Sequence, residues 1–244
     1  MKSVKGKGLT FFLITIMIMS VLIISPKVTA QDKLPDFKDV PKTAWYYDYV
    51  SSLANLGIVK GYGDSGEFRP MNLVTREHAT KMILLATQQN HRVKSTHVSK
   101  AIIGQEDGIK RDHAAKMIQV AFGLKMSTKE VKIKDLPTHD PELAEAIEIL
   151  AGNGVVKGYG NSHHFKSDHD VNRAEFAKML CLAMTAKAIQ DAESLVTPAA
   201  ISQAQIQIDR LSKTQDADSK AFLQTRLDCL RESVDLGPIY IYKI

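Results

Sequence analysis

The sequence predicts a mainly α-helical protein made of repeated helix–loop–helix units followed by a helical hairpin. Three observations predict this fold class: an internal repeat, apolar residues at helical spacing around a glycine-rich loop in two copies, and two more apolar stripes near the C-terminus. Apolar residues spaced three and four apart lie on one face of an α-helix, because the helix has 3.6 residues per turn.

Residues 1–30 have the layout of a secretory signal peptide. A lysine-rich start precedes the apolar run Leu9 to Ile24, and Val28-Thr29-Ala30 supplies small residues for cleavage. An uncleaved membrane anchor is the alternative, but a run of about 16 residues is shorter than the ~20 that span a bilayer. We therefore expect a secreted protein with no membrane span after signal cleavage.

The basic charge belongs largely to this N-terminal segment. Residues 1–30 hold four lysines and no acids, so the formal net charge of +5 falls to +1 without them. Nucleic-acid binding would need a clustered basic face, and we expect no nucleic-acid partner.

The internal repeat is the strongest feature of the chain. Residues 53–63 (LANLGIVKGYG) match residues 150–160 (LAGNGVVKGYG) at an offset of 97, and the match continues without a gap to 82 and 179. A middle copy keeps the segment around Arg111, which aligns with the segment around Arg76. Its first helix and loop are missing or shrunken, since only about 28 residues separate Ile83 from Arg111. Repeats of this kind bury their apolar faces against neighbouring copies.

The repeat divides the chain into six predicted parts. They are a signal peptide (1–30), a first unit (31–86), a degenerate middle unit (87–128), a third unit (129–186), a helical hairpin (187–236) and a tail (237–244).

Each complete unit is predicted to be helix, loop and helix. The first helices are Ala44 to Leu56 and Pro141 to Gly152, and a glycine follows at 57 and 154, where a helix commonly ends in a left-handed turn. The loops 58–63 and 155–160 are too rich in glycine for a helix and are short strands or loops. Phe68 and Phe165 are expected to plug the core.

The second helices are predicted to begin after Thr75 and Asn172, both good N-cap residues. Glu175 completes a capping box in the third unit, whereas His78 takes that position in the first unit and gives a weaker cap. Lys110 stands at the cap position of the middle unit, where it is a poor cap.

The hairpin follows the break at Thr197-Pro198. One stripe contains Ile201, Ala204, Ile208 and Leu211, and the other contains Phe222, Leu223, Leu227 and Leu230. We expect these stripes to pack on each other rather than form a binding face. The tail is predicted to be a short strand or disordered.

Other chemistry has little support. Cys181 and Cys229 could form one disulfide, although Cys181 also suits a core position as a small hydrophobe. The cluster His163, His164, Asp168, His169 and Asp170 could hold a metal, but a solvated loop fits better. No catalytic motif is present, so we expect no enzyme activity, no cofactor and no metal.

These residues resemble the S-layer-homology module, which typically occurs as three tandem copies. The matching motifs in the first unit are Phe37-Lys38-Asp39-Val40, Trp45-Tyr46, the loop Gly57 to Tyr62, Phe68-Arg69-Pro70 and Val74-Thr75-Arg76-Glu77. The likeness covers residues 36–185. It implies a bundle with pseudo-threefold symmetry, and grooves between units that bind secondary cell-wall polysaccharide, commonly pyruvylated.

The resemblance also implies the ligand contacts. Asp39 and Trp45 would contact sugar, the backbone of Gly57 to Gly61 would line the groove, and Arg76 would hold the pyruvyl carboxylate. Together with their counterparts in the other units, the candidate glycan-binding residues are Asp39, Trp45, Gly57, Lys60, Gly61, Arg76, Arg111, Asp135, Gly154 and Arg173.

The position of the arginines agrees with an anion site. Arg76 and Arg173 fall in the first turn of a helix, where backbone N–H groups and the helix dipole favour an anion. The alternative is that Arg76 pairs with a carboxylate of a neighbouring unit. Trp45 is equally compatible with sugar stacking and with a core position.

The third unit departs from the pattern, since Glu142 replaces Trp45 and Ser167 replaces Pro70. The predicted function is non-covalent anchoring to the bacterial cell wall by a secreted surface protein. The alternative is a decayed scaffold that acts structurally or binds protein partners, such as other surface-layer proteins.

Overall fold

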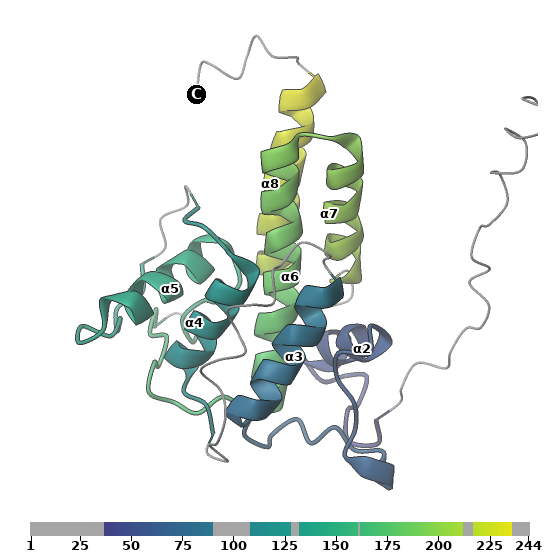
Figure 1. The fold of residues 1–244 in the computed structure, drawn as a ribbon, viewed down its shortest axis with the longest axis vertical. Coiled ribbons are helices and arrows are strands. Elements are labelled where there is room, and N and C mark those ends of the chain that lie inside the picture. Colours follow the sequence, from purple (N-terminus) through teal and green to yellow (C-terminus); the bar gives the residue numbers. More distant parts are fainter. Residues whose placement is uncertain (1–36, 90–107, 128–131, 161, 212–216, 236–244) are drawn as a thin grey trace, which may run out of the picture. The chain divides into compact units, whose positions relative to one another are not determined.

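The computed structural model describes residues 37–89, 108–127, 132–160, 162–211 and 217–235 (Figure 1). Within them the regular structure is helical, which confirms the predicted fold class. The helices are α2 (Tyr47–Asn55), α3 (Arg76–Gln89), α4 (Arg111–Phe122), α5 (Pro141–Gly152), α6 (Arg173–Leu195), α7 (Pro198–Arg210) and α8 (Ala217–Asp235), with a 3₁₀ turn η1 (Gly63–Ser65). The expected signal peptide and the tail lie outside the described residues.

Three backbone hydrogen bonds tie the repeats into a ring. The N–H of Val74 donates to the carbonyl of Val171, Val171 donates to Ile109, and Ile109 donates to Val74, each at 2.9 Å. These three residues occupy the same position in the three repeats, two residues before the second helix begins, and their side chains are buried. The ring gives the repeats the pseudo-threefold arrangement that the resemblance implies.

The second helices of the three repeats, α3, α4 and α6, contact one another in pairs around this ring. The first helices pack on a different repeat from their own, since α2 packs on α6 and α5 packs on α4. Each repeat therefore completes its neighbour's core, as expected for units that cannot bury an apolar face alone.

The loops of the first and third repeats share their backbone conformation. Gly57 and Gly154 are left-handed, with φ of +68° and +74°, which confirms the predicted helix ends. Phe68 and Phe165 are fully buried, as expected. The segments 58–63 and 155–160 form no strand and are loops, the first entering η1.

The predicted helix caps are also present. The side chain of Asn172 accepts from the N–H of Glu175, and the Glu175 carboxylate accepts in return from the N–H of Asn172. In the first repeat Thr75 Oγ1 accepts from the N–H of His78 at 3.2 Å. Lys110 makes no side-chain cap contact, which confirms that it is a poor cap.

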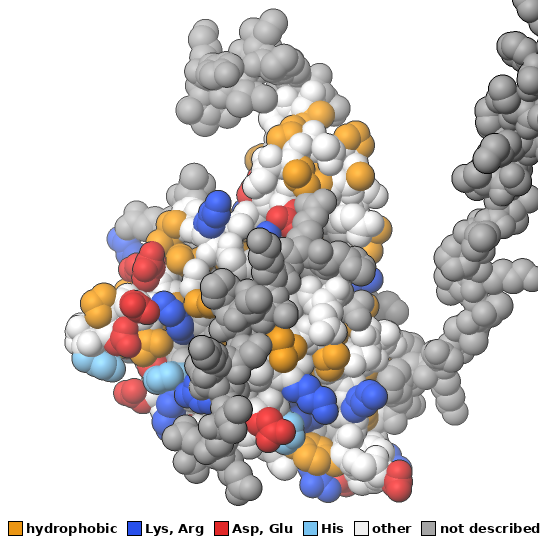
Figure 2. Space-filling model, in the orientation of Figure 1, with side chains coloured by type: hydrophobic (Ala, Val, Ile, Leu, Met, Phe, Trp, Pro, Cys, Tyr) orange, Lys and Arg blue, Asp and Glu red, His pale blue; other side chains and the backbone are white. Residues whose placement is uncertain are grey.

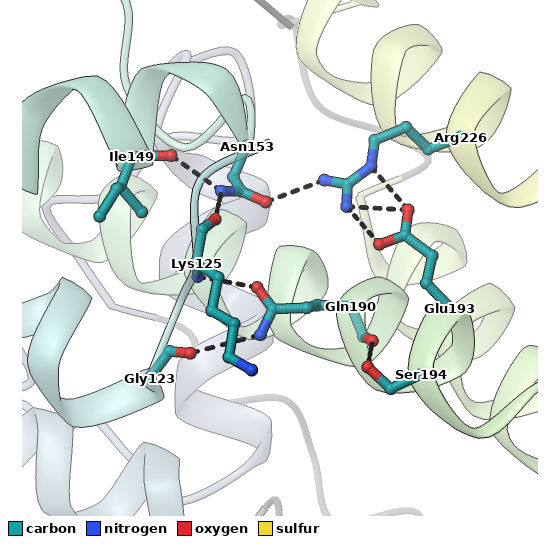
Figure 3. Close-up of polar contacts among 8 residues, drawn as sticks. All are labelled: Gly123, Lys125, Ile149, Asn153, Gln190, Glu193, Ser194 and Arg226. Carbon is teal, nitrogen blue, oxygen red and sulfur yellow. Dashed lines mark hydrogen bonds and ion pairs between the residues drawn. The ribbon is translucent and has the colours of Figure 1, made fainter. Parts of the chain in front are cut away.

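The hairpin α7–α8 packs on itself and along α6 (Figure 1). A polar network fastens α8 to the repeats (Figure 3): Arg226 donates to the Asn153 side-chain oxygen at 3.0 Å and pairs with both carboxylate oxygens of Glu193 on α6. The Asn153 amide, in turn, donates to the carbonyls of Ile149 and Lys125, each at 2.8 Å. The hairpin is thus joined to the ends of α4 and α5 as well as to α6.

The two cysteines are free thiols. Cys181 is buried on α6, where burial raises its pKa to about 12, and its thiol donates to the carbonyl of Tyr49 at 3.5 Å. Cys229 is exposed on α8. Of the two roles considered for Cys181, the structure shows the small core hydrophobe.

Two glycines with matched backbones allow a test of how α8 docks. A Cβ added to Gly57 would meet nothing within 4 Å, whereas one added to Gly154 would lie 2.6 Å from the Phe222 ring. Gly57→Ala should cost about 1 kcal/mol in the free energy of unfolding, from the left-handed conformation alone. Gly154→Ala should cost about 2–4 kcal/mol, because Phe222 must also move. Urea unfolding of both variants measures the difference, and equal losses would mean that α8 does not pack on Gly154 in solution.

Candidate functional site

Two grooves of the same construction lie between the repeats. Groove 1 is lined by the loop Gly57–Gly63, one face of α3 and Arg173 from the third repeat. Groove 2 is lined by Val155–Gly160, the matching face of α6 and Arg111 from the middle repeat. Groove 2 also includes Trp45 from the first repeat and Ser219 from α8. Each groove thus combines the loop and second helix of one repeat with an arginine from the preceding one.

The two arginines are held in equivalent clamps. The Arg173 guanidinium lies between the rings of Tyr62 and Phe68, 4.8 and 4.4 Å from their centroids, and its Nε donates to the Phe68 carbonyl at 2.8 Å. The Arg111 guanidinium lies between Tyr159 and Phe165 at 4.8 and 4.6 Å, and its Nε donates to the Phe165 carbonyl at 3.0 Å. Both arginines are only 6% exposed. Each is therefore a structural link between repeats as well as a wall of a groove.

The two remaining nitrogens of each guanidinium set the chemistry of the groove. Nη2 of Arg173 donates to the Lys60 carbonyl at 3.3 Å. Nη1 of Arg111 is instead 3.7 Å from a carboxylate oxygen of Glu175. Burial lowers the pKa of Arg173 from its ordinary value, opposed by Tyr62 and Asp39, yet an arginine starting from so high a value stays charged at neutral pH.

The aromatic side of groove 2 comes from the first repeat. Trp45 is 39% exposed, and the Lys178 ammonium lies 5.9 Å from the centroid of its ring. A half-exposed indole beside a cation offers an apolar face that can stack on a sugar ring. The exposure of Trp45 argues against the core position, and sugar stacking by Trp45 stays a prediction.

The same position in the third repeat has been converted to an ion pair. Glu142, which replaces Trp45, accepts from Lys116, the counterpart of Lys178, at 3.0 Å. The residues before α4 in the middle repeat, 90–107, lie outside the described residues. The third repeat thus has an acidic side chain, Glu142, where the first repeat supplies the aromatic Trp45 to groove 2.

The first-turn N–H groups of α6 and α4 are already hydrogen-bonded, whereas an anion site at a helix start needs them free. The N–H groups of Arg173 and Ala174 already donate to the carbonyls of Asn72 and Pro70, at 2.9 and 3.0 Å. The N–H groups of Arg111 and Asp112 donate to His169 and Ser167 in the same way. A ligand at these two arginines therefore cannot use these first-turn amides, because they join the repeats.

The predicted site residues fall into three groups. Groove 1 contains Gly57, Lys60, Gly61 and Arg173, and groove 2 contains Trp45 and Arg111. Asp39, Asp135, Gly154 and Arg76 line neither of these grooves. Arg76 begins α3 and is partly exposed, and its role as a ligand contact stays a prediction.

Asp39 and Asp135 line neither groove and instead accept hydrogen bonds from the backbone of their own repeats. Asp39 accepts from the N–H groups of Phe68 and Arg69, at 2.7 and 2.6 Å, one bond to each carboxylate oxygen. Asp135 accepts from Phe165 and Lys166 in the third repeat, at 2.5 and 2.7 Å. These bonds hold each core phenylalanine in its turn, so any sugar contact by the aspartates remains a prediction.

Sequence reasoning missed several groove residues. Tyr62 and Tyr159 form one wall of each arginine clamp, and Lys81 and Lys178 lie on the facing helix. The signal was present, because the tyrosines and the Lys-Met pairs are in register between the repeats. It was hidden because a lysine on a helix is ordinarily a solvated residue.

Tyr159 makes a side-chain hydrogen bond inside groove 2. Its hydroxyl donates to Glu175 at 2.6 Å. Burial, helped by this hydrogen bond and opposed by Arg111, raises the pKa of Tyr159 to about 12. The phenol therefore remains a donor throughout the neutral range, and it holds the Glu175 carboxylate inside groove 2.

The described residues contain no group of three histidine, cysteine or acidic side chains placed to hold a metal. In the His/Asp-rich loop, Asp170 pairs with Lys110 at 2.8 Å.

On the face in Figure 2, most lysine and arginine side chains in view lie over the repeats, and the surface over the hairpin is more hydrophobic and uncharged. Across the described part of the chain, no helix is both apolar and long enough to cross a bilayer.

Tandem helical repeats with matched grooves between them define a binding module. A model of the S-layer homology domain matches residues 36–80 and 132–177, which contain the loops and helix starts of both complete repeats. The chain is an S-layer homology domain protein. Domains of this family anchor proteins to bacterial cell walls, which supports a general anchoring role at the cell surface. No curated protein matches the chain.

The arginine clamp can be tested by a pair of identical substitutions. Arg173→Lys loses the Nε–H bond to Phe68 and the planar stack between two rings, and should lower the free energy of unfolding by about 2–3 kcal/mol. Arg69→Lys changes the exposed arginine on the same Tyr62 ring, paired with Glu67, and should cost less than about 1 kcal/mol. Urea unfolding compares them, and an equal cost would contradict the clamp.

Tyr159 should make stability depend on alkaline pH. Its folded-state pKa of about 12 lies above the ordinary value of 10.0, so its stabilising effect is complete below pH 10 and is lost as the pH rises from 10 toward 12. The loss should be smaller in Tyr159→Phe, which cannot ionise. Urea midpoints of both proteins between pH 9 and 11.5, roughly spanning this window, provide the measurement. Parallel curves would show that Tyr159 does not titrate this way.

Proposed function

We propose that this protein attaches non-covalently to the bacterial cell wall by binding an acidic secondary polysaccharide, of the pyruvylated kind, in the grooves between its repeats. The observation that carries the proposal is the duplicated groove. Two loops of nearly identical sequence face two lysines at the same helical position, and a buried arginine from the neighbouring repeat closes each groove.

The chemistry of the grooves suits a charged sugar. Lysine and arginine donors bind carboxylates, glycine-rich backbone allows a sugar ring to approach closely, and an exposed indole can stack on its apolar face. Groove 1 has a volume of about 380 Å³, within the roughly 300–1,000 Å³ of small-ligand sites, and groove 2 is smaller at about 250 Å³. Secretion through the N-terminal segment is part of the proposal, since the wall lies outside the membrane.

The family supports a role in binding. S-layer homology domains are binding modules. We propose binding alone for the chain.

We also consider a second function, a structural or protein-binding scaffold, because of the residue at position 142 in the third repeat. The Glu142–Lys116 ion pair stands there in place of an aromatic contact, so this position offers no ring on which a sugar could stack. A structural or protein-binding scaffold, joined to other surface-layer proteins, would tolerate such a loss. That function predicts binding that is indifferent to the acidic groups of the polymer.

Cosedimentation with purified cell walls tests the proposal. The protein without residues 1–30 should sediment with walls, and less of it should sediment after mild acid removes ketal-linked pyruvate. Lys81→Ala, which removes an exposed cation of groove 1, should reduce binding about 3- to 10-fold, equivalent to about 0.7–1.4 kcal/mol. Trp45→Ala should reduce it similarly through groove 2.

The matched control is Lys132→Ala, an exposed lysine that lines neither groove, and it should bind as the parent protein does. Failure of the parent protein to sediment would overturn the proposed function. Equal sedimentation before and after pyruvate removal would favour the scaffold.

A further inference from the structure

One of the two matched grooves has a wall that lies outside the repeats. Ser219, in the first turn of α8, lines groove 2 and is only 8% exposed. The described residues that line groove 1 all come from the first and third repeats. Because α8 lies beyond both segments that match the family model, its place in groove 2 is a property of this chain.

The loop that forms groove 2 starts at a residue that α8 holds. Asn153, the C-cap of α5, is 1% exposed, and its side-chain oxygen accepts from Nη1 of Arg226 at 3.0 Å (Figure 3). The Asn153 amide nitrogen donates to the carbonyls of Ile149 and Lys125. Arg226 is in turn fixed by both carboxylate oxygens of Glu193. The buried amide is therefore bonded through both its donor and its acceptor, and α8 supplies one partner.

Two further contacts come from the same face of α8. The Phe222 ring lies against Gly154, since a Cβ added there would be 2.6 Å from the ring. The Asp218 carboxylate pairs with Lys157 at 3.8 Å, an exposed pair that adds little to stability. Positions 218, 222 and 226 are four residues apart and so share one face of the helix. This face contacts the start of the groove 2 loop at three positions.

Groove 1 provides the comparison within the same molecule. Leu56, which aligns with Asn153, has no polar atom in its side chain, and a Cβ added to Gly57 would meet nothing within 4 Å. The groove 1 loop thus lacks both the amide contact and the ring contact that hold the groove 2 loop. Groove 2 is also the smaller of the two, at about 250 Å³ against about 380 Å³.

These contacts couple α8 to whatever binds in groove 2. A loop without the Arg226 and Phe222 contacts has more conformations to lose, and a ligand must then offset the cost of ordering it. Linkage works equally in the other direction. A ligand that binds only when the loop is held stabilises the docking of α8 by the same free energy.

We infer that the hairpin is a functional part of groove 2. Arg226 and Phe222 are positioning residues that hold the groove 2 loop for the wall polymer, and the docking of α8 is coupled to binding in that groove. Groove 1 binds without this support. The inference rests on the proposed function, because it presumes that a wall polymer enters the grooves.

A double-mutant cycle tests the coupling. Arg226→Met removes the bonds to Asn153, and it should weaken binding of purified secondary wall polysaccharide about fivefold in calorimetry. In a Trp45→Ala background, where groove 2 is already impaired, the same change should cost less than about twofold. In a Lys81→Ala background, which impairs groove 1, the full loss should remain. A general defect of folding would weaken binding equally in both backgrounds.

Two variants on α8 serve as the control and the second probe. Arg231→Met makes the same substitution at an arginine that pairs with Asp228 at 3.1 Å and lines neither groove, and it should bind as the parent protein does. Phe222→Leu loosens the contact with Gly154 and leaves the polar network intact. It should show the same dependence on background, even if Arg226→Met does not fold.

Hydrogen exchange of the α8 amides measures the reverse effect. Adding the purified polysaccharide should slow exchange in α8 of the parent protein and of Lys81→Ala, because bound ligand holds α8 in place. In Trp45→Ala the exchange of α8 should change much less. A hairpin that packs on the repeats without a role in binding would not respond to the polysaccharide.

The outcomes separate the two levels of proposal. If the parent protein binds neither the polysaccharide nor purified walls, the proposed function fails and the coupling fails with it. If the parent binds and both Arg226→Met and Phe222→Leu bind as tightly, the function stands and the hairpin has no part in it. Equal losses in the Trp45→Ala and Lys81→Ala backgrounds would likewise overturn the coupling, as would unchanged exchange in α8.

Discussion

The ring of three hydrogen bonds among Val74, Ile109 and Val171 is the constraint on which the rest of this structure depends. Each bond joins the residue before one second helix to its counterpart in another repeat, so the three helices start at a common centre. Because the arginines follow two residues later at Arg76, Arg111 and Arg173, the ring also decides which repeat each arginine can reach. The grooves lie where an arginine arrives at its neighbour's loop, and their position is therefore a consequence of how the repeats are joined.

The arginine clamps combine two duties that are hard to separate. Arg173 stacks between two rings and donates to two carbonyls of the first repeat, and it also forms the floor of groove 1. Removing a buried, hydrogen-bonded cation leaves its partners unsatisfied and its aromatic neighbours without packing. A loss of binding after such a change says little about ligand contact. Side chains that line a groove without joining repeats, such as Lys81 and His78, report on the ligand more directly.

Most local structure could be predicted from the sequence, because its causes are local. The bounds of α5, the left-handed glycines and the capping box of α6 follow from propensities and hydrogen bonds within a few residues. The pairing of helices across repeats could not be read from periodicity, since a stripe shows that a helix is buried but not which partner covers it. The same limit explains Asp39 and Asp135, whose bonds reach residues 29 to 31 positions away. At the candidate site, the glycine loops and the arginines were found by their repetition, while the tyrosines and lysines that line the grooves could be recognised only once the arginine of the neighbouring repeat was placed against them.

The differences between the repeats affect how a polymer could bind across the grooves. A symmetric trimer would offer three equal grooves, and a polymer bound in one would gain from the high effective concentration of its next residues at the others. Here the Glu142–Lys116 pair occupies the aromatic position beside the middle repeat, and the two described grooves differ in their lining, since His78 stands in one where Glu175 stands in the other. Unequal grooves suit a polymer whose sugars are themselves unequal. A polymer that lies across unequal grooves meets different side chains at each groove, so its direction of binding matters, whereas equal grooves would not distinguish the two directions.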